Sequence, residues 1–422
     1  MNRIWASASG GSACAVAFVV VIAGCDRTGL RTRVADGGSS SGPDTQEAVV
    51  RDQAMEPQVD LWDGGKDLET PPEAPFDGPV LGPEIGWDGE TPPEAGSSAC
   101  PGAVNVTTTL ADLAAEALPS ALVVNDDRVF VGVMDDTQEV PTGAIVAVSL
   151  ATGQTTRFPL GQTVANQIVA MPGALFYLQG KVAKIADGWS IEYTDVGRLD
   201  LTSGKVSIVD SAVVSSAVTI WSVVGNASGV YWSMLTDMNG ASVIRRWDDE
   251  AGTTQTVFSW GDTLSLLIDQ DHFYWSQLDS GLHTVFMSMP IPSGPIVQIF
   301  QWPQVFPDAP SLSAIDDQSL YYFAGGSAPP GIVAMLKTAG DDHMVLSGAQ
   351  PILFGSQTID DKHLYWVDQS DQSSIRRAPK TVDAPTEIFW SASSDTISNL
   401  AVDDCNVYWT ASAPSRLLAR AK

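Results

Sequence analysis

The apolar and polar positions of residues 100–422 follow a short pattern that returns seven times. An apolar run is followed by an acidic or turn-forming pair, one more apolar residue and an aromatic pair, as in residues 400–409. Continuously apolar runs predict buried strands, and Asp and Asn favour tight turns because they tolerate left-handed backbone. Each copy therefore predicts a β-hairpin. The copies end at Val131, Tyr177, Trp232, Trp275, Tyr322, Trp366 and Trp409.

The spacing of these copies predicts a ring of repeated sheets. Successive copies lie 43 to 55 residues apart, and in several repeats two more strand-like segments follow the aromatic pair. Four short strands per repeat need a period in the forties, which is typical of β-propeller blades. We therefore predict an all-β fold, a β-propeller of seven four-stranded blades. Six blades are the alternative, because the first two copies are weak.

Closure of the ring needs a strand from outside the last repeat. Only one strand-like segment, residues 416–420, follows the last copy, so its blade lacks a fourth strand. Residues 103–109 alternate and are β-branched, and we predict that they fill the gap. Cys100 precedes this segment and Cys405 lies in the turn of the blade that it would complete. In an oxidising compartment we predict a Cys100–Cys405 disulfide, worth about 4–5 kcal/mol by loop-closure entropy; two reduced thiols are the alternative.

The first residues have the pattern of an export signal. Arg3 is followed by an apolar segment at 15–21 that is too short for a comfortable membrane span. Residues 22–25, Ile-Ala-Gly-Cys, resemble the lipobox of bacterial lipoproteins. The resemblance implies a signal peptide over 1–24 and a lipid anchor on Cys25, with an ordinary cleaved signal as the alternative. We expect an exported protein held at the outer membrane or cell surface in preference to the inner membrane.

Residues 25–99 predict a tether between the lipidated Cys25 and the propeller. Pro, Gly, Ser and acidic residues dominate the segment, and 26–99 contain 16 acidic and 5 basic residues. Such a composition cannot bury enough apolar area to offset the entropy of ordering, so we predict a disordered linker. The formal net charge of the whole chain is −28. This excess of negative charge argues against binding of nucleic acid and against docking on anionic lipid.

The aromatic pairs carry a family resemblance. Residues 231–233, 274–276, 365–368 and 408–410 read Tyr-Trp-Ser, Tyr-Trp-Ser, Tyr-Trp-Val-Asp and Tyr-Trp-Thr. They resemble the YWTD repeats of lipoprotein-receptor-type β-propellers, and are similar to propeller lipoproteins of bacterial, myxobacterial type. The receptor propellers have six blades, whereas seven copies occur here. The resemblance implies a protein-binding platform and no particular chemistry.

No residues in the sequence predict a metal, a cofactor or a catalytic site. Acidic pairs such as Asp316-Asp317 would suit Ca²⁺, but they fall at one place in each repeat, and a ring would spread them over separate blades. We interpret them as turn formers. The four histidines have no common spacing, and nucleophile, metalloprotease and phosphate-loop motifs are missing. The four histidines are His272, His283, His343 and His363.

The aromatic residues at strand ends suggest a binding face. In a propeller the loops after the second and fourth strands of every blade emerge on one side, and Trp and Tyr often anchor interfaces there. Trp at a strand end is as often plain blade packing. We predict an envelope lipoprotein, a monomer, whose propeller is a non-catalytic platform for a protein partner. A carbohydrate-binding module, or a propeller lyase or hydrolase, are the alternatives. The candidate face comprises Trp189, Tyr193, Trp260, Trp302 and Trp390.

Overall fold

The computed structural model describes most of the propeller and nothing before it. The predicted signal peptide, Cys25, the tether and Cys100 lie outside the described residues. No helix in the described part of the chain is long and apolar enough to cross a membrane. The described residues are 106–113, 117–125, 127–137, 139–185, 188–212, 220–235, 242–260, 263–279, 281, 283–305, 310–324, 331–337, 342–344, 352–368, 370, 372–412 and 414–422.

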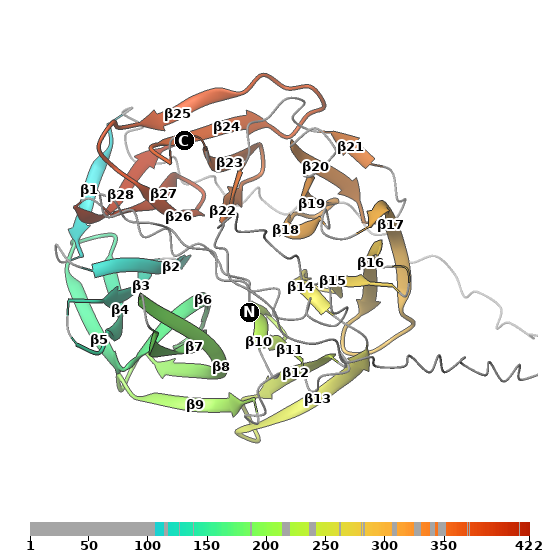
Figure 1. Cartoon of the computed structure of the whole chain (residues 1–422), viewed down its shortest axis with the longest axis horizontal. Coiled ribbons are helices and arrows are strands. Elements are labelled where there is room, and N and C mark those ends of the chain that lie inside the picture. Colours follow the sequence, from blue (N-terminus) through green and yellow to red (C-terminus); the bar gives the residue numbers. More distant parts are fainter. Residues whose placement is uncertain are drawn as a thin grey trace, which may run out of the picture. The chain divides into compact units, whose positions relative to one another are not determined.

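Seven antiparallel four-stranded sheets surround a common centre (Figure 1). The sequence prediction of seven blades is confirmed, and the six-bladed alternative is wrong. Blades 1 to 6 take four consecutive strands each, from β2–β5 to β22–β25, and blade 7 consists of β26, β27, β28 and β1. The innermost strands are β2 (Ala117–Asn125), β6 (Thr163–Met171), β10 (Ile220–Asn226), β14 (Thr263–Ile268), β18 (Ser311–Ile315), β22 (Ile352–Ile359) and β26 (Ile397–Val402).

Each aromatic pair opens or fills the second strand of its blade. These strands are β3 (Arg128–Asp135), β7 (Ala174–Ile185), β11 (Gly229–Leu235), β15 (His272–Leu278), β19 (Ser319–Ala324), β23 (His363–Asp368) and β27 (Asn406–Ser412). The third strands are β4 (Thr142–Ser149), β8 (Gly188–Asp200), β12 (Ser242–Asp248), β16 (His283–Pro290), β20 (Gly331–Leu336), β24 (Ser374–Pro379) and β28 (Ser415–Ala421). The outer strands are β5 (Thr155–Gly161), β9 (Val206–Ser211), β13 (Thr253–Trp260), β17 (Val297–Val305), β21 (Asp342–Met344), β25 (Glu387–Ser391) and β1 (Thr108–Asp112).

The core lies in layers between neighbouring blades. Successive side chains of a strand point to opposite faces, so the two aromatic residues of a pair enter different layers. Tyr365 of blade 6 and Trp409 of blade 7 belong to one buried cluster, and Tyr321 of blade 5 and Trp366 of blade 6 to another. Trp366 and Trp409 are both 0% exposed. The recurrent aromatic pair therefore joins each blade to both of its neighbours.

The closing strand lies later in the chain than predicted. β1 begins at Thr108, pairs antiparallel with β28, and places Thr109 opposite Leu418. Ala111 and Leu113 are buried in the layer that joins blades 7 and 1, whereas Val106 is 59% exposed. The β-branched pattern suggested residues 103–109, but burial of these two apolar side chains determines the observed register.

The longest spacing between two copies of the pattern, 55 residues from Tyr177 to Trp232, includes a long hairpin of blade 2. β7 and β8 have 12 and 13 residues and pair along their length, from Ala174 opposite Asp200 to Ile185 opposite Gly188. The additional residues of this repeat lengthen the hairpin between the second and third strands of the blade.

Candidate functional site

The turns between first and second strands lie on one face of the ring, and aspartates build four of them. The first aspartate of each of these turns accepts backbone amides through one oxygen and a tyrosine hydroxyl through the other. Asp316 Oδ1 accepts the amides of Gln318 and Ser319 at 3.0 and 2.8 Å, and Asp316 Oδ2 accepts the Tyr321 hydroxyl at 2.7 Å. Side-chain acceptors of this kind stabilise tight turns. Asp269, Asp360 and Asp403 repeat the same arrangement with Tyr274, Tyr365 and Tyr408.

Three of these aspartates also receive a lysine from the next blade. Lys380 Nζ of blade 6 donates to Asp316 Oδ2 of blade 5 at 2.5 Å. The Lys380 ammonium lies 5.8 Å from the centre of the Tyr321 ring. Lys337 and Lys422, at the equivalent place after the third strands of blades 5 and 7, reach Asp269 and Asp360 at 2.7 and 3.0 Å. The turn aspartates therefore join neighbouring blades as well as closing turns.

The pKa values of these groups follow from their surroundings. Burial by itself raises the pKa of Asp316, but the hydrogen bonds from Lys380, Tyr321 and two amides outweigh it, and the pKa lies below its ordinary value. The pKa values of Asp269 and Asp360 are lowered by the same balance. Burial and the nearby carboxylate raise the pKa of Tyr321. Carboxylate and phenol therefore keep their ionised and neutral forms around neutral pH.

Further carboxylates on this face point to solvent. Asp271, Asp317, Asp361 and Asp404 are exposed residues of the same turns, and the side chain of Asp127 in the blade 1 turn is 74% exposed. Since all turns between first and second strands emerge on the same side of a propeller, these carboxylates lie on one side of the ring, together with the exposed Lys362 and with Arg128, which lies 3.5 Å from Asp127. We call this side the acidic face.

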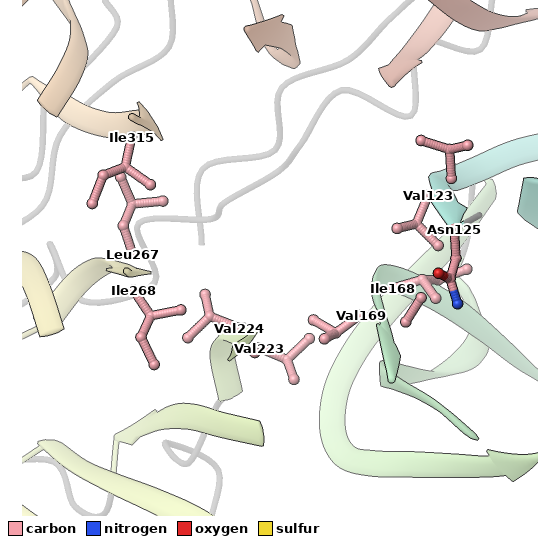
Figure 2. A pocket seen from close by; sticks show the side chains of 12 residues that line it. Val123, Asn125, Ile168, Val169, Val223, Val224, Leu267, Ile268 and Ile315 are labelled. Atoms are coloured by element: carbon pink, nitrogen blue, oxygen red, sulfur yellow. The ribbon is translucent and has the colours of Figure 1, made fainter. Parts of the chain in front are cut away.

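The centre of the ring opens into an apolar cavity next to the acidic face. Its volume is about 380 Å³, and its lining comes from the innermost strands of blades 1 to 5. Figure 2 shows the side chains of these strands arranged around the opening. Asn125 is the one polar side chain among the described residues that line it. The other labelled side chains are Val123, Ile168, Val169, Val223, Val224, Leu267, Ile268 and Ile315.

A second cavity continues this opening outward. It has a volume of about 330 Å³ and shares Ile268 and Ile315 with the apolar cavity. Its remaining lining belongs to the turns of blades 3 to 5 and includes Asp269, Asp316 and Asp317. An apolar chamber and a carboxylate-lined chamber are therefore adjacent. The residues that line the apolar cavity belong to the apolar runs of the sequence. Which of them face the centre of the ring depends on how the ring closes, so the sequence did not predict the cavity.

The structure describes the side chains of three members of the candidate aromatic face, and Trp302 among them is buried. Trp302 is only 8% exposed and packs between blades 4 and 5, with its ring 5.7 Å from that of Tyr322. Trp390 is half-buried against Trp409 at 4.9 Å. Trp302 is therefore a packing residue, because its strand turns that side chain into an inter-blade layer. Tyr193 is half-buried, and the side chains of Trp189 and Trp260 lie outside the described part.

The described cysteine lies in the turn that the repeat predicts, and the described histidines lie in different strands. Cys405 is half-buried in the blade 7 turn, and Cys100 is not described, so the disulfide between them stays a prediction. His272 and His363 begin second strands of different blades, and His283 lies 3.3 Å from Asp279 at the other end of blade 4 from His272. Within the described ranges no three His, Cys, Asp or Glu side chains gather as metal ligands would.

Comparison with known proteins shows the fold. No protein-family model matches the chain, and no curated protein matches it in sequence. Among solved structures, the β-propeller domain of the Trilobed protease from Pyrococcus furiosus is similar with a TM-score of 0.54 and 11% identity, over 72% of this chain and 95% of that one. A puromycin-hydrolyzing peptidase of Mycobacterium tuberculosis has a TM-score of 0.52 and 14% identity, over 72% of this chain and 51% of the peptidase.

A third similar structure has another activity. Virginiamycin B lyase from Staphylococcus aureus has a TM-score of 0.51 and 12% identity, over 75% of this chain and 99% of the lyase. Identities this low carry information on the fold alone, because one fold supports many unrelated functions. The three structures confirm the β-propeller and favour neither binding nor catalysis for this chain.

Proposed function

We propose that this protein is an exported, lipid-anchored binding platform whose propeller holds a protein partner in the cell envelope. The observation that carries the proposal is the open centre of the ring, where lining side chains that are apolar except for Asn125 adjoin exposed carboxylates. Concave apolar sites with a few polar groups are suited to binding, and acid–base chemistry needs titratable groups within reach of one another. Asn125 cannot supply such chemistry to the apolar chamber.

The anchor and the tether belong to the same proposal. Cys25 follows the lipobox-like residues, and the acidic residues 26–99 give the propeller a long reach from the membrane. The carbohydrate-binding alternative is weaker, because Trp302 is buried in blade packing and Trp390 is half-buried. For the lyase or hydrolase alternative, the sequence offers no candidate catalytic residues.

In-cell crosslinking of the lipidated full-length protein, followed by mass spectrometry of the attached peptides, tests the platform. We expect reproducible links from one face of the propeller to a single envelope protein. Links to abundant neighbours spread over all faces would overturn it. Fractionation of a Cys25→Ser variant tests the anchor separately: the variant should leave the membrane fraction, and its retention there would show that Cys25 is not the anchor.

A further inference from the structure

We propose that the acidic face binds an extended segment of the partner that carries basic residues next to an aliphatic side chain. The aliphatic side chain enters the apolar cavity and the basic residues lie over the turn carboxylates. This inference deepens the proposed function and rests on it. It assigns a site on the propeller and the chemistry of the ligand that this site takes.

The apolar cavity favours an aliphatic group. Its lining of Val, Ile and Leu residues comes from five separate strands, and it shares Ile268 and Ile315 with the cavity lined by the turns of blades 3 to 5. Such a surface in contact with water costs free energy that an inserted aliphatic side chain would recover. Besides the backbone groups of the innermost strands, a polar ligand would find one side-chain amide, that of Asn125, among the described residues of the lining.

The border of the cavity favours positive charge. Asp317 lines the outer cavity and is exposed, and Asp271 is exposed in the adjacent turn of blade 4. Asp269 and Asp316 already hold Lys337 and Lys380, so they are largely neutralised within the fold. Asp271 and Asp317 therefore supply the field that a basic ligand would meet. Complementary charge speeds association and selects the partner.

Charge also decides between occupants. The chain's own residues 26–99 carry 16 acidic and 5 basic residues, and a second copy of the chain has the same net charge of −28. Both would bring negative charge to an acidic border. A separate protein with a basic segment is the occupant that the charges favour.

The shared residues Ile268 and Ile315 set the spacing of the ligand. They belong to both chambers, so one ligand can place an apolar group on one side of them and a cation on the other. Alternate residues of an extended peptide point to opposite sides about every 3.3 Å, so neighbouring basic and aliphatic residues fit this arrangement. The site therefore suits an extended segment in which the two kinds of residue alternate.

The test uses the full chain and fluorescent nine-residue peptides in an anisotropy titration at low and high salt. One peptide alternates Arg and Leu, a second replaces Arg by Glu, and a third replaces Leu by Ser. We expect the Arg–Leu peptide to bind most tightly and to weaken with salt. Ile268→Ser should weaken it about tenfold, and Asp271→Asn with Asp317→Asn about fivefold.

A matched variant removes the same charge from the opposite side of the ring. Glu139 and Glu192 are exposed near the turns between second and third strands, and Glu139→Gln with Glu192→Gln should leave the affinity unchanged. The aspartate double variant changes exposed turn residues alone, so it keeps the test valid if Ile268→Ser unfolds. Equal losses in both double variants, or equal binding of all three peptides, would overturn the site.

Two further outcomes would also overturn it. Binding that appears only after removal of residues 26–99 would identify that segment as the occupant. Absence of peptide binding, together with in-cell crosslinks from the opposite face to one envelope protein, would leave the platform standing and remove this site. Failure of the platform itself would show in the crosslinking experiment, whatever the peptides do.

Discussion

The turn aspartates combine two roles in one carboxylate. One oxygen of Asp360 accepts the amides of Lys362 and His363 at 2.7 Å each, and the other accepts the Tyr365 hydroxyl at 3.0 Å. The exposed neighbour Asp361 makes no such contact among the hydrogen bonds described. Adjacent aspartates of one pair therefore differ in what they do, although the sequence presents them as equivalent.

Replacement of Asp316 by Ala should lower the free energy of unfolding by about 1–3 kcal/mol, because two amides and the Tyr321 hydroxyl lose their acceptor. Asp317→Ala is the matched control and should change it by less than about 0.5 kcal/mol, since the residue is exposed. Denaturant titration followed by tryptophan fluorescence measures both. Equal effects of the two variants would contradict the assigned roles.

Stability should also fall in acid. The folded-state pKa values of Asp269, Asp316 and Asp360 are lowered by their hydrogen bonds and lysine partners. A carboxyl group of this kind stabilises the fold above its unfolded pKa of about 4, and the contribution is lost as pH falls through the folded pKa. We expect the free energy of unfolding to decrease below about pH 4. Asp316→Asn should show a shallower decrease, and an unchanged slope would argue against this origin.

At the scale of the elements, the third strand of one blade is connected to the first turn of the preceding blade. Lys337, Lys380 and Lys422 follow β20, β24 and β28 and reach Asp269, Asp316 and Asp360. The equivalent positions in blades 1 and 2 are Leu150 and Leu201. Blades 4 to 7 are therefore joined by ion pairs that the first two blades do not share.

Lys380→Met tests one of these links. The side chains of Lys380 and Asp316 are 13% and 23% exposed, so loss of the ammonium leaves a half-buried carboxylate without its cation. We expect the free energy of unfolding to fall by about 1–2 kcal/mol, above the range of an exposed pair. Lys362→Met, at an exposed position of the neighbouring turn, is the control and should have little effect. Similar values for the two would show that the link contributes nothing.

The whole ring is closed by a strand from the N-terminal side of the propeller. β1 completes blade 7 beside β28, and the Leu113 amide donates to the Ser415 carbonyl oxygen at 2.9 Å. Leu113 is 2% exposed in the layer that includes Leu417 and Ala117. This layer holds the two ends of the propeller together.

Leu113→Ala should lower the free energy of unfolding by about 2–4 kcal/mol, because it leaves a cavity at the closure. Val106→Ala, in the same segment but 59% exposed, should change it by less than about 0.5 kcal/mol. Thermal and denaturant unfolding of the two variants give the comparison. A small effect at Leu113 would mean that β1 contributes little to closing the ring.

The repeated pattern was sufficient to predict the fold because its aromatic pairs have to be buried. Tyr365 and Trp366 are adjacent in sequence and both fully buried, which needs a blade on each side of their strand. The turn role of the aspartates could also be predicted from the sequence, because the amide and hydroxyl groups that donate to each carboxylate lie within five residues of it. The number of blades follows from the number of repeats, and the order of strands within a blade and the hairpin turns are local properties of each repeat.

The tertiary structure alone decided what lies between repeats. Lys380 and Asp316 are 64 residues apart, and Lys337 and Asp269 are 68 apart, so no local pattern pairs them. The register of β1, the burial of Trp302 and the apolar cavity depend likewise on which blades become neighbours when the ring closes. Contacts within a repeat were determined by the sequence, because short-range sterics and burial select them. Contacts between repeats were determined by the closed ring, because its geometry selects which distant side chains meet.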